Sequence, residues 1–360
     1  MNIKFKTERL GKYLAKKRKW QGVPSVEVTE NGRVYVAFYS GGKDEQLGNF
    51  CVLLAGNEND GFREIAAADA GRFGRCFDPA LWTDEKGRLW LFFATMPKMR
   101  TYAVICKNPC DKSENLVWGK PFFVAEGIML NKPLVTSGGE ALLPVSVWEK
   151  TLCEKTVKVC KKMKISPAAA KDGAYAVIYK NGSFKVGGRV RSYAPSYDEH
   201  MFLEKDNGGN VEVYIRTTGE IEKAESADGG RTFSAPVKSG IKNPNSRFFI
   251  KKLRSGRVLL INHYNYKGRN NLTALLSEDD GKTFPYSLLL DERNKVSYPD
   301  CAEGKDGFLY IVYDRERGSK NQREEKSAKE ILLAKIKEED ILCGRLSEKS
   351  KLKIIVSKLS

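Results

Sequence analysis

Histidine is scarce in this chain: only His200 and His263 occur among its 360 residues. The eight cysteines are scattered along the sequence without the paired spacing of a zinc ribbon. Because structural zinc sites use clustered cysteine and histidine ligands, this composition argues against a Cys/His metal site. Free thiols in a reducing compartment explain the cysteines more simply. We therefore expect neither a metal nor a cofactor.

Long apolar runs are also lacking, and no segment reaches the length that a transmembrane helix needs. The first twenty residues contain lysines and arginines but no apolar segment of the kind found in a signal peptide. These absences predict a soluble, cytoplasmic chain without an export signal. They also predict that no membrane is a partner.

Acidic residues are outnumbered, which gives a formal net charge of +17. Clustered cations can bind nucleic-acid phosphates, and the densest clusters here are residues 16–19 and 155–164. Neither cluster is interleaved with stacking aromatics or placed on a recognisable nucleic-acid module. We expect a basic, solvated surface and no nucleic-acid partner.

A short turn pattern, Ser-x-Asp-x-Gly-x-Thr-aromatic, is present twice. The copies are Ser226 to Phe233 and Ser277 to Phe284, about 50 residues apart, and a weakened third copy covers residues 57–61. In this pattern a short acceptor side chain closes the turn, the glycine supplies a positive φ, and the aromatic ring packs beneath. The recurrence indicates a repeat architecture.

A longer pattern occurs six times: an apolar stretch, a glycine-containing turn, and a second run of β-branched and aromatic residues. Residues 33–38 and 308–313 are examples of the second run, and both are nearly continuous in apolar residues. Such runs are typical of strands covered on both faces. The turns are expected at six glycines: Gly32, Gly87, Gly139, Gly209, Gly256 and Gly307.

The spacing of these turns leaves room for four strands in each repeat. We therefore predict an all-β fold, a six-bladed β-propeller of four-stranded antiparallel blades, because radial closure protects the strand edges. Residues 1–360 would form one domain, with blades at about 20–70, 75–125, 127–190, 195–240, 244–292 and 295–345. Residues 352–356 are expected to close the ring by pairing near residues 3–5. Two insertions are expected, a lysine-rich one at 149–173 that includes helix-tolerant alanines, and a polar loop at 315–328.

Polar residues are concentrated where the first strand of each repeat begins. In a propeller these starts converge on one face, and convergent charges in a concavity predict a binding or catalytic site. The alternative is that each residue only caps a strand or bridges two blades. The positions are Asp78, Asn131, Lys132, Asp198, Glu199, His200, Arg247, Tyr298 and Asp300.

From about residue 20 to 343 the chain resembles the sialidase (neuraminidase) superfamily, in particular bacterial sialidase-like proteins with Asp-box (BNR) repeats. Its two turn motifs resemble Asp boxes. Tyr298, in Tyr298-Pro299-Asp300, resembles the nucleophilic tyrosine of that superfamily, and Glu199 resembles the glutamate that polarises it. Arg216 and Arg269 resemble the second and third arginines of the substrate-binding triad.

The chain departs from this superfamily in its first repeat. Gly22-Val23-Pro24 stands where an Arg-Ile-Pro-like motif is usual, so the first arginine is missing. Arg247 and Lys132 are candidates to supply the lost charge. The acid/base aspartate has no clear counterpart, and its candidates are Asp44, Glu45 and Asp78. The other polar residues at the strand starts, Asn131, Asp198, His200 and Asp300, are candidate substrate contacts.

The resemblance implies an exo-acting glycoside hydrolase that removes a terminal acidic sugar from an oligosaccharide or glycoconjugate. A neutral phenol suits a substrate whose anomeric carbon bears a carboxylate, and sialidases are an exception to the usual two-carboxylate scheme. Glu199 would take the proton of Tyr298, and arginines would bind the substrate carboxylate. Two alternatives stay open: a uronate-directed lyase using His200 and Tyr298, and a glycan-binding propeller without catalysis.

Overall fold

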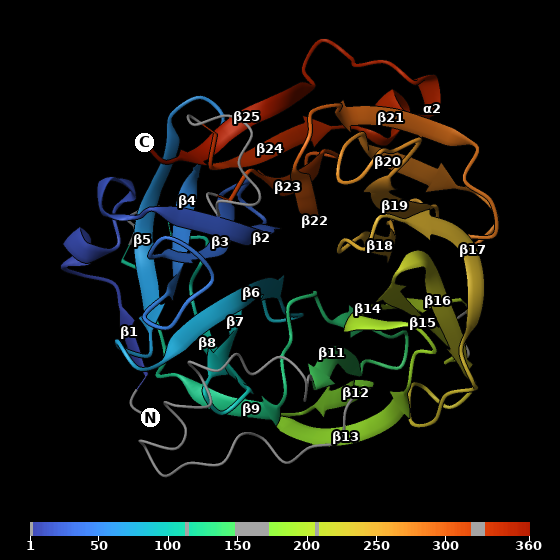
Figure 1. Ribbon diagram of the computed structural model, residues 1–360, viewed down its shortest axis with the longest axis horizontal. Coiled ribbons are helices and arrows are strands. Elements are labelled where there is room, and N and C mark those ends of the chain that lie inside the picture. The colour runs from blue at the N-terminus through green and yellow to red at the C-terminus, as the bar shows by residue number, and fades with distance from the viewer. Residues whose placement is uncertain (1–2, 112–114, 148–172, 206–208, 318–327) are drawn as a thin grey trace.

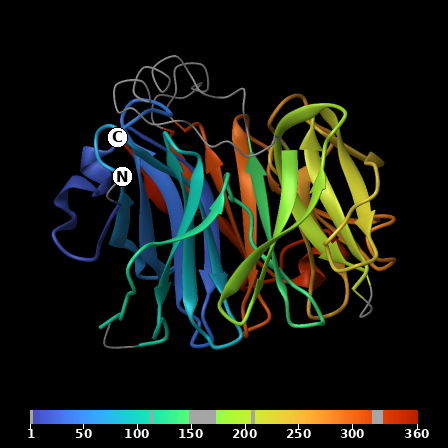
Figure 2. The ribbon, with the colours of Figure 1, turned by 90° about the horizontal axis from the view of Figure 1, so that it is seen from below.

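The computed structural model describes residues 3–111, 115–147, 173–205, 209–317 and 328–360. Six β-sheets surround a central axis, and the chain passes through them in order (Figure 1). Seen edge-on, the strands run between two faces, and the connections gather on those faces (Figure 2). The predicted all-β, six-bladed propeller is confirmed. The two predicted insertions lie almost wholly outside the described residues.

Within each blade the four strands follow one another in sequence order, and neighbouring strands pair antiparallel. The first blade contains β2 (Trp20–Val28), β3 (Val34–Gly41), β4 (Phe50–Asn57) and β5 (Gly61–Asp69). The second contains β6 (Arg75–Thr83), β7 (Leu89–Met96), β8 (Arg100–Cys106) and β9 (Phe122–Glu126). The third contains β10 (Leu134–Val135), β11 (Ala141–Val147), β12 (Gly173–Lys180) and β13 (Ser183–Val190).

The second half of the ring repeats this order. The fourth blade contains β14 (Pro195–Glu204), β15 (Val211–Thr217), β16 (Gly219–Ser226) and β17 (Val237–Asn243). The fifth contains β18 (Phe249–Lys252), β19 (Val258–His263), β20 (Leu272–Ser277) and β21 (Tyr286–Asp291). The sixth contains β22 (Val296–Glu303), β23 (Leu309–Arg315), β24 (Glu330–Ile336) and β25 (Lys351–Lys358). The described helices are α2 (Glu338–Cys343), η1 (Leu10–Lys12) and η2 (Ala15–Lys17).

The second strand of each blade lies in the middle of the hydrophobic core. Every residue of β7 and β23 is buried. Side chains on one face of such a strand pack against the preceding blade and those on the other face against the following blade. This two-sided burial explains why these strands are continuously apolar rather than alternating.

All six predicted turn glycines have positive φ, between 70° and 88°. Each one lies between the first and second strands of its blade. Glycine tolerates this region because it has no Cβ atom. The sequence prediction of these turns is therefore confirmed.

The first strands are irregular near their beginnings. Val23, Asp78 and Tyr298 have left-handed φ values of 56°, 47° and 58°, and each precedes a proline. The register of the strand pairing shifts at all three places. A bulge of this kind re-aims side chains, and non-glycine residues in this region are concentrated at functional sites. The bulges direct neighbouring residues of three blades toward the axis.

The two Asp boxes share one hydrogen-bond pattern. Asp228 Oδ1 accepts from Ser226 Oγ at 2.7 Å and from the Thr232 main-chain N–H at 2.9 Å, while Oδ2 accepts from Thr232 Oγ1 at 2.6 Å. The second box has the same bonds around Asp279. Both turns follow the third strand of a blade, at the ends opposite to the first-strand starts. They are braces of the outer sheet, far from the converging polar residues.

The predicted pairing of residues 352–356 with residues 3–5 is wrong. β25 pairs with β24 inside the sixth blade, whereas β1 (Lys4–Lys6) pairs with the outer strand β5. Each blade forms its four strands from consecutive sequence, so the sixth blade needs no strand from the N-terminal segment. Side chains join the last blade to the first instead: Asp314 accepts from the Val23 N–H at 2.8 Å and Asp300 accepts from Ser25 Oγ at 2.6 Å.

Candidate active site

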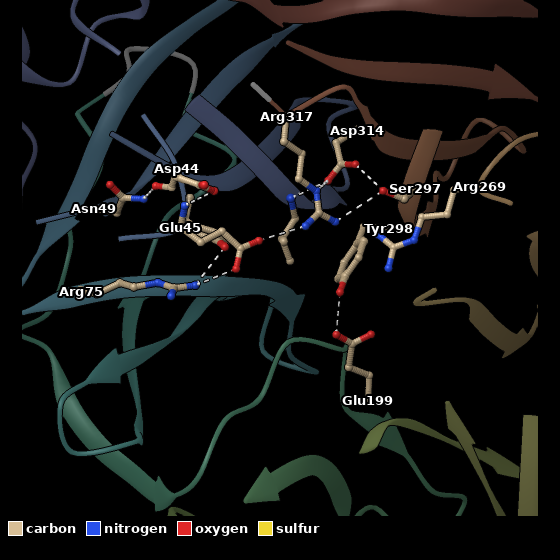
Figure 3. Close-up of polar contacts among 12 residues, drawn as sticks. Asp44, Glu45, Asn49, Arg75, Glu199, Arg269, Ser297, Tyr298, Asp314 and Arg317 are labelled. Atoms are coloured by element: carbon tan, nitrogen blue, oxygen red, sulfur yellow. Dashed lines mark hydrogen bonds and ion pairs between the residues drawn. The ribbon is translucent and has the colours of Figure 1, made fainter. Parts of the chain in front are cut away.

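A tyrosine and a glutamate meet where the fourth and sixth blades approach the axis. Tyr298 Oη donates to Glu199 Oε1 at 2.8 Å (Figure 3). Both side chains are buried, with exposures of 8% and 4%. Burial raises the pKa of the Tyr298 phenol, and the neighbouring Arg216 guanidinium opposes that rise. The resting phenol is therefore neutral and has a carboxylate acceptor for its proton.

Arg216, near the end of β15, contacts both members of this pair. Its Nη1 donates to Glu199 Oε2 at 2.6 Å and to Tyr298 Oη at 2.9 Å. Its other nitrogens donate to the side chain and main chain of Asn245, at 3.0 and 2.8 Å. These bonds fix the orientation of the guanidinium relative to the tyrosine hydroxyl.

Arg269 reaches the same pocket from the loop between β19 and β20. Its Nη2 donates to the Asn245 carbonyl at 2.8 Å, the acceptor that Arg216 also uses. The guanidinium carbons of Arg269 and Arg216 lie 5.5 and 5.9 Å from the centroid of the Tyr298 ring. Four residues selected from the sequence, Glu199, Arg216, Arg269 and Tyr298, are thus brought together.

A third guanidinium, which the sequence patterns did not single out, is closer still. Arg317 lies just beyond β23, and its guanidinium carbon is 4.0 Å from the centroid of the Tyr298 ring. Its Nε donates to Asp314 Oδ2 at 2.9 Å, and its Nη1 donates to Glu45 Oε1 at 3.2 Å. A usable signal was its place near the end of the second strand of a blade, which Arg216 shares.

Arg75 was also missed, although it stands three residues before Asp78. Its guanidinium stacks on Phe77 and Tyr39, 4.3 and 5.0 Å from the ring centroids. It also donates to Tyr39 Oη at 2.9 Å and to Glu45 Oε2 at 3.4 Å. Glu45 therefore bridges Arg75 and Arg317 across the first, second and sixth blades (Figure 3).

The three candidate acids differ in environment. Asp44 is exposed and accepts a hydrogen bond from the Glu45 N–H inside its own loop. Glu45 contacts two guanidinium groups, as described above. Asp78 is buried, and burial raises its pKa to about 7, because the pull of Arg75 is offset by the negative charges of Glu45 and Glu199. Asp78 thus shares the electrostatic environment of the tyrosine and glutamate pair.

Arg247 and Lys132, the candidates for the charge of the missing first arginine, both donate to main-chain carbonyls. The Arg247 side chain, in a residue only 1% exposed, donates to the main-chain carbonyls of Pro299, Leu130 and Pro24 at 2.8 to 3.2 Å. Lys132 donates to the Leu81 carbonyl at 2.7 Å and to that of Val26. Strands that converge without pairing present carbonyls to the axis, and these two cations satisfy them.

The remaining candidates form inter-blade contacts. The His200 ring contacts the Asp198 and Tyr175 carbonyls at 2.9 and 3.1 Å, and burial lowers its pKa to about 4. Asn131 donates to the His200 carbonyl at 2.8 Å. Asp300 accepts from Ser25 and from the Val26 N–H. Asn131, His200 and Asp300 thus bridge neighbouring blades, and Asp300 Oδ2 also lies 3.4 Å from Lys132 Nζ.

Within the described residues, no group of three His, Cys, Asp or Glu side chains is placed to hold a metal ion. No helix in the described part of the chain is long and apolar enough to cross a membrane. The six described cysteines are free thiols, and Cys153 and Cys160 lie outside the described residues.

Comparison with known proteins gives both a sequence family and structural neighbours. The family described as BNR repeat-like domain matches residues 33–311, more than half of the chain. The intramolecular trans-sialidase from Ruminococcus gnavus, solved with oseltamivir carboxylate, superposes with a TM-score of 0.67 at 12% identity, covering 94% of this chain and 98% of that one. The Hadza microbial sialidase Hz136 gives 0.63 at 14% identity, covering 83% of this chain and 64% of that one.

A protein of unknown function from Dyadobacter fermentans superposes with a TM-score of 0.60 at 16% identity, covering 83% of this chain and 92% of that one. This chain therefore spans somewhat less than two thirds of the Hadza sialidase but most of the other two neighbours. No curated protein sequence matches the chain. At these identities the likeness establishes the sialidase-like fold.

Proposed function

Because the chain belongs to the BNR repeat-like domain family and has a sialidase-like fold, we propose that it is an exo-acting glycoside hydrolase that removes a terminal acidic sugar from a glycan. One observation carries this proposal: the Tyr298 hydroxyl donates to Glu199, and Arg216 contacts both groups. A neutral nucleophile with its own base, surrounded by guanidinium groups, suits an anionic substrate.

In the first half of the reaction, Tyr298 Oη forms a bond to the anomeric carbon while the bond from that carbon to the leaving oxygen breaks. The phenolic proton moves to Glu199, which activates an otherwise weak nucleophile. An acid protonates the leaving oxygen. In the second half, water attacks the anomeric carbon while the bond from that carbon to Tyr298 Oη breaks. The proton of the water goes to the conjugate base of the acid, and the released Tyr298 oxygen recovers its proton from Glu199. The products are the free sugar and the alcohol.

The choice of a phenol follows from charge. A carboxylate on or near the anomeric carbon would repel an ionised Asp or Glu nucleophile, whereas a neutral hydroxyl can approach. Arg216 and Arg269 are placed to bind that carboxylate, because guanidinium groups match carboxylates in a bidentate geometry. Their shared acceptor, the Asn245 carbonyl, holds the two groups at a fixed spacing.

Asp78 is the favoured acid. A general acid must be protonated near the working pH, and a pKa of about 7 makes a substantial fraction of Asp78 protonated there. Glu45, by contrast, forms ion pairs with both Arg75 and Arg317. Asp44 bonds within its own exposed loop.

The lyase alternative requires His200 as a base with access to substrate. Its ring nitrogens instead face the carbonyls of Asp198 and Tyr175, and it is 1% exposed. No observation favours that alternative. The experiment below distinguishes the hydrolase from a glycan-binding propeller without catalysis.

The test is a panel of aryl glycosides of sialic, uronic and neutral deoxy sugars. Tyr298→Phe and Glu199→Gln should each lower kcat on the accepted glycoside by at least about 100-fold. Tyr214→Phe is the matched control, because Tyr214 is also buried and donates to a glutamate, Glu212, at 2.7 Å, but this pair lies in the packed interior of the fourth blade. Binding without turnover of any glycoside, or full activity in Tyr298→Phe, would refute the hydrolase.

A further inference from the structure

Gly22 and Arg317 occupy one space. A Cβ atom added at Gly22 would lie 2.7 Å from Arg317 Cδ, 2.9 Å from Cγ and 3.0 Å from Nε. Real Cβ atoms essentially never approach other heavy atoms so closely, so a side chain at position 22 and this conformation of Arg317 exclude each other. Gly22 does not have a left-handed φ, and its lack of a side chain therefore serves this close approach.

Arg317 is fixed in this position from two blades. Its main-chain carbonyl accepts from the Gln21 N–H at 3.1 Å, which ties it to β2. Its Nε is bonded to Asp314, a fully buried carboxylate that also accepts from Ser297 Oγ at 2.7 Å. A carboxylate bonded to a guanidinium in this way orients its fork of donors. The guanidinium is thus oriented before any ligand arrives.

Among the described residues, four arginines have their guanidinium carbon within 5.9 Å of the centroid of the Tyr298 ring, and one of them, Arg247, donates to main-chain carbonyls. Arg317, Arg269 and Arg216 lie 4.0, 5.5 and 5.9 Å from the centroid of the Tyr298 ring. Burial lowers the pKa of Arg269, and the charges of Arg317 and Arg216 lower it further. Cations concentrated in this way are stabilised by an anion placed among them. The positive charge around Tyr298 therefore favours the binding of a substrate carboxylate beside it.

We propose that Arg317, delivered from the sixth blade into the space vacated at Gly22, is the cation that makes this site selective for an anionic sugar. The proposal rests on the proposed hydrolase for its substrate class. It assigns to Arg317 a contact with the substrate carboxylate. The other nearby arginines have different surroundings: Arg247 is bonded to three carbonyls, and Arg75 packs on the rings of Phe77 and Tyr39.

The test measures binding, so it does not depend on turnover. The probes are a 2,3-unsaturated sialic acid and its neutral carboxamide, titrated calorimetrically into the full chain. The unmodified protein should bind the acid at least about tenfold more tightly than the carboxamide. Arg317→Met, which keeps the apolar stem over Tyr298, should reduce this preference to less than about twofold. Arg317→Lys should retain part of it, because the charge stays but the bidentate fork is lost.

Gly22→Ala provides an independent test of the shared space. It should lower the preference for the acid over the carboxamide when Arg317 is present and leave that preference unchanged in Arg317→Met, which has no guanidinium to displace. Gly22→Arg combined with Arg317→Gly should restore the preference by moving the cation to the other strand. Circular dichroism and Tm establish that each variant is folded.

Each outcome decides one of the two proposals. An acid preference that survives in Arg317→Met, or additive effects of the Gly22 and Arg317 changes, would overturn the assignment of Arg317. Failure of the unmodified protein to prefer the acid would overturn it as well. Hydrolysis of no glycoside, together with an acid preference that depends on Arg317, would instead overturn only the hydrolase.

Discussion

Arg247 and Arg317 both lie near the Tyr298 ring, with guanidinium carbons 5.7 and 4.0 Å from its centroid, yet their surroundings differ. Arg247 is bonded to main-chain carbonyls of three blades and joins them at the axis. Arg317 is held by two side-chain carboxylates, those of Asp314 and Glu45. We infer that the bonding partners of an arginine, rather than its proximity to Tyr298, separate the structural role of Arg247 from the proposed substrate-binding role of Arg317.

The largest effect is expected from removing the structural arginine. Arg247→Met leaves the carbonyls of Pro24, Leu130 and Pro299 buried without this donor, which should cost about 3–5 kcal/mol of unfolding free energy. Arg269→Met is the matched control, with an expected change below about 1 kcal/mol but a rise in KM for the acidic glycoside. Denaturant unfolding measures the change in unfolding free energy, and steady-state kinetics measures the change in KM. Equal stability losses would remove the distinction between the two kinds of arginine.

Asp78→Asn should give a smaller effect on activity that depends on pH. If Asp78 is the acid, activity on a poor leaving group falls as pH rises through about 7, because Asp78 loses its proton. In Asp78→Asn this fall of activity above about pH 7 should be absent, and kcat on the poor leaving group should be about 100-fold lower. The loss of kcat should be smaller on a nitrophenyl glycoside, whose leaving group needs less protonation. Glu45→Gln should keep the fall of activity above about pH 7. The opposite result would make Glu45 the acid.

We also expect Asp78→Asn to change the stability of the fold. The direction of the change follows from the difference in the pKa of Asp78 between the folded and unfolded states. The folded-state pKa of Asp78 lies above its usual value, so ionisation of this group destabilises the fold increasingly from about pH 4 to about pH 7 and by a constant amount above that. The Tm of Asp78→Asn should therefore exceed that of the unmodified protein at pH 8, and the gap should narrow toward pH 4. A gap that widens on acidification would contradict the raised pKa.

The smallest effect is expected at an Asp box. Asp228→Asn weakens the bonds to Thr232 and Arg231 at an exposed turn, which should cost about 1 kcal/mol of unfolding free energy. Hydrogen bonds from Thr232 and Ser226 outweigh burial and hold the pKa of Asp228 at about 2, so this contribution should persist down to mildly acidic pH. Glycosidase kinetics should be unchanged. A change in kcat would place the turn nearer to function than its position on the outer sheet indicates.

The sequence alone determined the repeat and therefore the fold. Six turn glycines with positive φ, continuous apolar second strands and two Asp boxes are local features, and each depends on residues close together in the chain. Because every blade repeats the same strand order, the starts of first strands and the ends of second strands had to converge. That regularity is why Glu199 and Tyr298 could be grouped as polar residues at first-strand starts, whereas Arg216 and Arg269 were singled out by the resemblance to sialidases.

Only the tertiary structure decided which polar residues face the pocket and which face the backbone. Arg317 fills the space left at Gly22, and Asp314 bonds the Val23 N–H, although these partners are nearly 300 residues apart in sequence. Such contacts depend on how the last blade meets the first, which local periodicity does not encode. The roles of Arg247 and Lys132 were likewise set by carbonyls that other blades present to the axis. The need to satisfy buried hydrogen-bonding groups across the closed ring therefore determines the position of each of these polar side chains.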